Sequence, residues 1–153
     1  METLTLDREN NMSILAFDVH GVLDTYSEFR SIAYNAAISK GVSVYIISGS
    51  LFNTEMQEEL SSYNFYYDKY FSITQEILDY NPDLVTWKDG KPYAPDHIWD
   101  KMKSVICERE KVNILFDDSP CYGKYFKDIS TTYVEVQNSH WKESGRICKS
   151  NIS

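Results

Sequence analysis

The sequence predicts an α/β fold, built on a parallel sheet with helices on both faces. Three short runs, 13–17, 42–47 and 112–116, are almost entirely apolar and lack a regular alternation with polar residues. Such runs are typical of strands that are buried on both faces. Segments with helical spacing lie between them, and strands that alternate with helices favour right-handed crossovers between parallel strands.

The first predicted strand and helix surround a carboxylate. The run over 13–17 ends at Asp18 in the stretch SILAFDVHGVLD. Thr25 and Glu28 have the spacing of a capping box, and apolar residues follow at helical intervals up to Gly41. We therefore expect a helix that begins at the capping box and packs one stripe on the sheet.

The next segment repeats this order. The strand over 42–47 ends as abruptly as the first, in Ser48-Gly49-Ser50. Near-helical spacing of apolar residues predicts a helix within 51–63, and an aromatic-rich stretch leads into a third strand at 70–73. A short helix over 74–80 is then expected to end at Asn81-Pro82.

The second half of the chain begins with a predicted hairpin. Two short strands, 84–87 and 91–93, flank Asp89-Gly90, which is a typical hairpin turn, so we expect a small flap over about 84–95. A helix opening at Pro95 carries an apolar stripe made of Ile98, Trp99, Met102, Val105 and Ile106. The run over 112–116 and a last strand over 131–136 complete the sheet.

The length suits one domain. With 153 residues, of which 42% are hydrophobic, the chain can bury a proper core. We assign residues 1–136 to a single α/β domain that contains the flap, and residues 137–153 to a polar C-terminal tail.

The composition limits the binding partners and the cellular compartment that we expect for this protein. The formal net charge of -8 opposes bulk binding of nucleic acid. Three cysteines, Cys107, Cys121 and Cys148, show no zinc or framework spacing and predict reduced thiols. The polar N-terminal stretch is unlike a signal peptide and no run has the length of a membrane span, so we expect a cytoplasmic protein without membrane binding.

Polar residues at the strand ends predict a functional site. Asp18, Ser48 and the pair Asp117-Asp118 each follow a predicted strand, and the carboxyl ends of parallel strands share one edge of the sheet. Carboxylates gathered there repel one another unless a cation lies between them. Oxygen ligands of this kind suit Mg²⁺, which also binds substrate phosphates.

This set of residues fits phosphoryl transfer. The carboxylate of Asp18 can attack phosphorus and form an aspartyl-phosphate. The Ser48 hydroxyl and the backbone N–H groups of Gly49 and Ser50 can bind phosphoryl oxygens, and a lysine can supply the remaining positive charge.

Three of these segments resemble the haloacid dehalogenase (HAD) superfamily of phosphatases. The stretch from Phe17 to Leu23 resembles the first motif, Ile46-Ile47-Ser48-Gly49 the second, and Leu115 to Pro120 the fourth. The resemblance covers most of the chain. It implies a Rossmann-like sheet, Mg²⁺ dependence and hydrolysis of phosphomonoesters. It also implies a metal site made of Asp18, the main-chain carbonyl of His20, and Asp118, with Asp117 acting directly or through water.

The lysine of the third motif has more than one candidate. Lys91-Pro92 ahead of a helix resembles one version of the motif, which also makes Lys91 a candidate for substrate binding. Lys101 and Lys103 lie on the following helix. The order Trp99, Lys103, Cys107 before Asp-Asp-Ser is similar to a set of short HAD-like proteins, and this favours Lys103.

His20 departs from the family pattern. Phosphatases of the superfamily normally carry Asp two positions after the nucleophile, where it protonates the leaving oxygen and then activates water. Histidine titrates near neutral pH and can do both. The alternative is that only the backbone carbonyl of His20 matters.

Two main hypotheses follow. The first is a Mg²⁺-dependent phosphohydrolase that acts on a small phosphorylated metabolite or nucleotide. The second is a HAD-like binding or regulatory module with weakened catalysis. A receiver-type domain is a third possibility, but its paired acids normally follow the first strand. The sequence assigns no oligomeric state.

Overall fold

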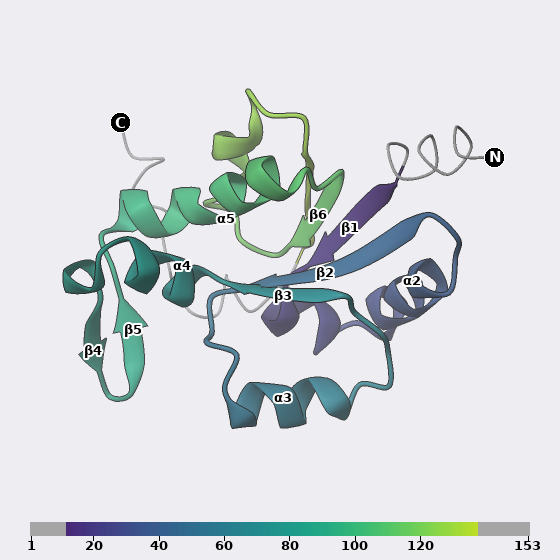
Figure 1. The fold of residues 1–153 in the computed structure, drawn as a ribbon, viewed down its shortest axis with the longest axis horizontal. Helices are drawn as coiled ribbons and strands as arrows, with labels where there is room; N and C mark the ends of the chain where they lie inside the picture. Colours follow the sequence, from purple (N-terminus) through teal and green to yellow (C-terminus); the bar gives the residue numbers. More distant parts are fainter. Residues whose placement is uncertain (1–11, 138–153) are drawn as a thin grey trace, which may run out of the picture.

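A five-stranded parallel sheet forms the centre of the molecule, in the order β3-β2-β1-β6-β7 (Figure 1). The computed structural model describes residues 12–137. The strands are β1 (Ser13–Phe17), β2 (Val42–Ser48), β3 (Lys69–Ser72), β6 (Ile114–Asp117) and β7 (Thr132–Glu135). The predicted α/β class with a parallel sheet is therefore confirmed.

The three apolar runs lie next to one another in this sheet. β1 is central and pairs in parallel with β2 on one side and with β6 on the other. Ala16 and Phe17 on β1 have no exposed surface, and neither have Ile46 and Ile47 on β2. Burial on both faces explains why these strands lack polar alternation.

Helices cover both faces, as predicted. α2 (Ser27–Ala37) and α3 (Thr54–Ser61) pack on one face, where Ala33, Met56 and Leu60 meet Phe17 and Ile46. α5 (Asp96–Glu110) and the short helix η3 (Gly123–Phe126) pack on the other. Figure 1 shows α2 and α3 on the opposite side of the sheet from α5.

A small antiparallel hairpin projects beyond the sheet, next to α4 (Figure 1). Its strands are β4 (Thr86–Lys88) and β5 (Lys91–Tyr93), and they follow α4 (Ile73–Tyr80) and the short η2 (Pro82–Leu84). Asp89 and Gly90 both have positive φ, of 53° and 75°, as expected for a tight hairpin turn. The predicted flap is present.

Several local predictions need correction. Thr25 does not cap α2: its hydroxyl donates to the neighbouring Asp24, and the N-cap residue is Tyr26, without a side-chain cap. On α5, Val105 is 40% exposed, whereas Lys103 is 2% exposed. The predicted helix is present, but its apolar stripe is wrong for Val105, because the buried face of α5 also meets the polar edge of the sheet.

The cysteines are not all reduced. Cys107 is a buried free thiol, but Cys121 is disulfide-bonded, so the prediction of reduced thiols is wrong for Cys121. Cys148 and most of the predicted tail, 138–153, lie outside the described residues.

Candidate functional site

Three buried carboxylates meet at the carboxyl edge of the sheet. Asp18 follows β1, Asp117 is the last residue of β6, and Asp118 comes next. Because β1 and β6 are neighbours, the Asp18 N–H donates to the carbonyl oxygen of Phe116 at 2.9 Å. One carboxylate oxygen from each of the three residues lies within 4.8 Å of the others.

Lys103 reaches this group from α5. Its Nζ lies 3.0 Å from Oδ1 of Asp18 and also forms an ion pair with Asp117. The side chain of Lys103 is only 2% exposed, so its ammonium is held among carboxylates rather than in water. Asp117 is held in turn by the Ser119 N–H, which donates to its Oδ1 at 2.9 Å.

The electrostatics of this site follow from burial. Burial raises the pKa of Asp18 to about 6; Lys103 opposes the rise and Asp118 adds to it. Burial likewise raises the pKa of Asp117 to about 6, with Asp18 adding to the rise and Lys103 opposing it. Burial alone would lower the pKa of Lys103, but the carboxylates of Asp117 and Asp18 outweigh it and the pKa is raised.

These residues fit a divalent cation. With all three carboxylates ionised and Lys103 protonated, the group carries two net negative charges. Oxygen atoms that share a metal with bonds of about 2.1 Å lie at most about 4.2 Å apart, and the three oxygen atoms of this group all lie within 4.8 Å of one another. A buried excess of negative charge with oxygen atoms at this spacing could hold a metal ion.

The loop after β2 forms a second wall. Ser48 is buried, and its Oγ accepts a hydrogen bond from the Ser50 N–H at 3.2 Å. A Cβ on Gly49 would lie 2.8 Å from the ring of Trp99, so the close approach of α5 requires glycine here. Trp99 is itself anchored, since its Nε1 donates to the hydroxyl of Tyr122 at 3.0 Å.

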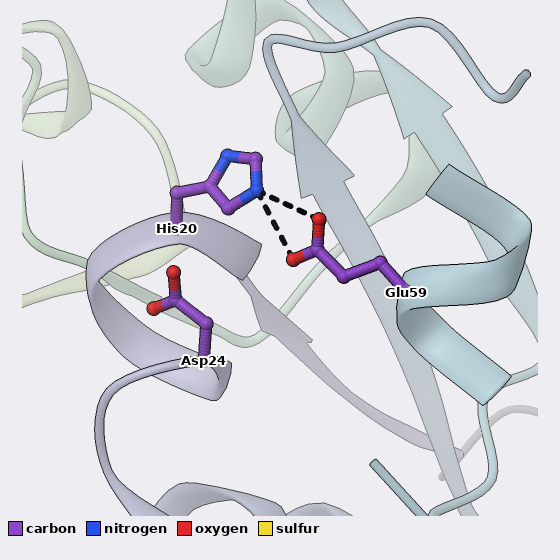
Figure 2. Close-up of side chains that lie close together, drawn as sticks. All are labelled: His20, Asp24 and Glu59. Carbon is purple, nitrogen blue, oxygen red and sulfur yellow. Dashed lines mark hydrogen bonds and ion pairs between the residues drawn. The ribbon is translucent and has the colours of Figure 1, made fainter. Parts of the chain in front are cut away.

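His20 is exposed and lies in the irregular turn η1 (Val19–Leu23), which directly follows Asp18. Gly21 has a φ of 91°, which permits this turn, and its N–H donates to Asp24 at 2.7 Å. The ring Nε2 of His20 lies 3.1 Å from both carboxylate oxygens of Glu59 on α3 (Figure 2). His20, Asp24 and Glu59 thus form a second group of three with ligand atoms within 4.8 Å.

All of the predicted site residues line one cavity of about 630 Å³. From the predicted set, these are Asp18, His20, Ser48, Gly49, Ser50, Lys91, Lys103, Asp117 and Asp118. The structure brings Lys103 to the carboxylates, whereas Lys91 is exposed on β5 and lines the cavity from the hairpin. Lys101 is exposed and does not line this cavity.

Sequence reasoning missed several residues of the site. Trp99 and Tyr122 line the cavity and were not assigned to it. Trp99 and Lys103 are four positions apart, so they share a face of α5, and this spacing could have identified Trp99. Glu59 is one of several acidic residues on an amphipathic helix, and no local signal distinguishes it.

A scan against models of protein families gives no match, and a search of curated proteins gives none either. The interpretation of the site therefore depends on its geometry and on the motifs that its residues form.

Proposed function

We propose that the protein is a Mg²⁺-dependent phosphohydrolase of the HAD-like type, which hydrolyses a phosphomonoester of a small metabolite or nucleotide through Asp18. One observation carries this proposal: Lys103 is buried among Asp18, Asp117 and Asp118 at the carboxyl edge of a parallel sheet. We assign the activity to a single domain over 1–136 that carries the hairpin as a small insertion.

The donor set favours Mg²⁺ because every ligand offered by this group is an oxygen. Asp18, Asp118 and the main-chain carbonyl of His20 would hold the ion, with Asp117 acting directly or through water. When bound, the ion would offset the charge that builds up on a transferring phosphoryl group.

Asp18 is the proposed nucleophile. Its carboxylate oxygen forms a bond to phosphorus while the bond from phosphorus to the ester oxygen breaks, which leaves an aspartyl-phosphate and an alcohol. Lys103 and the Val19 N–H both contact Oδ1 at 3.0 Å, so the carboxylate is already oriented. Water then attacks the phosphorus, and phosphate leaves with Asp18 restored.

The groups around Asp18 would bind the phosphoryl oxygens. The Ser48 hydroxyl and the Gly49 and Ser50 N–H groups lie on the neighbouring strand end, and Lys91 faces the same cavity from the hairpin. His20 is the proposed acid and base: it gives a proton to the leaving oxygen and later takes one from water.

The attachment of His20 to Glu59 favours the second candidate function. Because the His20 ring is held toward α3, it is less free to protonate the leaving oxygen than the Asp that phosphatases of the superfamily normally carry at this position. A HAD-like module that binds metal and phosphate with weak turnover therefore remains the alternative.

Phosphate release from a panel of monoesters in the presence of Mg²⁺ tests the proposal. Asp18→Asn should lower the rate by about 10³-fold or more, because the variant lacks the nucleophile. The exposed loop residue Asp128 offers a matched control, and Asp128→Asn should keep the wild-type rate. Equal phosphate release by the wild type and Asp18→Asn would contradict the proposed enzymatic activity. Calorimetric binding of Mg²⁺ and phosphate without turnover would support the binding module instead.

A further inference from the structure

A smaller cavity of about 230 Å³ adjoins the candidate active site, between α3 and the hairpin. His20, Ser50, Lys91 and Pro92 line both cavities. A substrate with its phosphoryl group at Asp18 would therefore have a path across this shared boundary. The rest of the substrate would extend past His20 into the smaller cavity.

The charges around the two cavities differ. Asp18, Asp117 and Asp118 lie beside Lys103 in the larger cavity, which suits phosphate together with a divalent cation. The smaller cavity is lined by Glu55 and Glu59 of α3, and its one lysine, Lys91, lies on the boundary shared with the active site. A bound phosphomonoester would thus have its phosphate beside lysine and its leaving group beside carboxylates.

Glu59 is held in place in this wall. The Tyr63 hydroxyl donates to its Oε2 at 2.5 Å, and His20 Nε2 lies 3.1 Å from both of its oxygens (Figure 2). A carboxylate held from two sides keeps its negative charge at a fixed place. Glu55 adds a second carboxylate to this wall, so an anionic leaving group would be repelled there and a cationic one attracted even when His20 is protonated.

On the side of the smaller cavity that faces α3, the hairpin supplies an aromatic wall. Trp87 is 52% exposed and lines the smaller cavity, as does Pro92, its partner on the neighbouring strand. Partners across two strands point to the same face, so both present an apolar surface to the cavity. An indole face near carboxylates is a favourable environment for an ammonium group.

We propose that the smaller cavity binds the leaving group and selects one that carries an ammonium group. The substrate class is then a zwitterionic phosphomonoester of an amino alcohol. This inference rests on the proposed function. It assigns specificity to Glu55 and Trp87, which the catalytic proposal does not use, and to Glu59, which also holds His20.

Three esters of similar size test the selection: phosphoethanolamine, ethyl phosphate and 2-phosphoglycolate, whose leaving groups are cationic, neutral and anionic. We expect kcat/KM to fall in that order, by at least about 10-fold between the first and the last. Glu55→Gln and Trp87→Ala should each reduce this ratio, mainly through KM for phosphoethanolamine. Glu58→Gln, on the exposed surface of the same helix and outside the cavity, should leave the ratio unchanged.

Equal kcat/KM for the three esters, or a preference for 2-phosphoglycolate, would overturn the inference. So would an equal loss of selectivity in Glu55→Gln and Glu58→Gln. Methyl phosphate, whose leaving group is uncharged and smaller than that of ethyl phosphate, separates the two proposals: if it is not hydrolysed either, the proposed function fails. In that case, calorimetry compares the affinities for phosphoethanolamine and 2-phosphoglycolate and tests the selectivity without catalysis. Equal affinities would contradict the proposed selectivity.

Discussion

Residues 12–137 contain two groups of three potential metal ligands, and these groups differ in burial. Asp18, Asp117 and Asp118 are buried, whereas His20 and Asp24 are exposed and Glu59 is half-buried. The buried carboxylates require a lysine among them, and the pKa values of Asp18 and Asp117 are raised. In the exposed group, Asp24 accepts from the Gly21 N–H and Thr25, and Glu59 from Tyr63.

The comparison shows that burial, rather than the number of acidic residues, creates the demand for a cation. Water screens charges at the exposed group, and neighbouring donors satisfy its oxygens. At the buried group, mutual repulsion and lost hydration act together, and only a positive charge offsets them. We therefore expect metal binding and electrostatic stability to depend on the buried group.

The largest expected effect comes from Lys103→Met. Removal of the ammonium takes away the positive charge that offsets the buried carboxylates of Asp18 and Asp117, which should lower the free energy of unfolding by about 3–5 kcal/mol in metal-free buffer. Urea denaturation measures this change. Lys101→Met, on the exposed face of the same helix, is the control and should change stability by less than about 0.5 kcal/mol.

A double variant distinguishes the loss of the Lys103 charge from the loss of its packing contacts. In Lys103→Met with Asp117→Asn, one of the unpaired charges is gone, so part of the lost stability should return. If the double variant is as unstable as the sum of the two single variants, the role of Lys103 is packing rather than charge.

The next largest effect is expected on Mg²⁺ affinity, which should depend on the buried group and not on the exposed group. Asp118→Asn removes the negative charge of a proposed ligand, so the Kd for Mg²⁺ measured by calorimetry should rise by more than about 10-fold. Asp24→Asn makes the same chemical change in the exposed group and should alter the Kd little. A larger effect of Asp24→Asn would place the cation at the exposed group instead.

The smallest expected effect is a pH dependence of a few degrees in Tm. Burial raises the pKa values of Asp18 and Asp117 from 3.8 to about 6 in the metal-free protein. Between about pH 4 and pH 6 the folded state keeps protons that the unfolded state has lost, so their contribution to stability falls as the pH rises. Mg²⁺ binds the ionised carboxylates, and its stabilising effect should therefore be small at pH 5 and full above pH 7.

Thermal unfolding with and without Mg²⁺ at pH 5, 6, 7 and 8 measures this dependence. Asp117→Asn should weaken it, because one of the two titrating groups is lost, while Asp24→Asn should leave it unchanged. A gain in Tm from Mg²⁺ that is as large at pH 5 as at pH 8 would contradict the role of the buried carboxylates.

Much of the fold and the buried site could be predicted from local sequence. An apolar run without alternation predicts a strand buried on both faces, and the residue after such a strand lies at the carboxyl edge of the sheet. This argument was enough to predict that Asp18 and Asp117, 99 positions apart, share a site. The choice among three lysines was harder, because the direction in which Lys103 points depends on how α5 packs.

The sequence by itself determined the strands, their polar ends and the kind of chemistry those ends can support, since these follow from patterns within a few residues. Only the tertiary structure decided that Glu59 holds His20, 39 positions away, and that Trp99 packs on Gly49. Such contacts depend on the packing of whole helices against the sheet, and no short-range pattern records that arrangement. The same reason explains why the cavity between α3 and the hairpin could not be foreseen.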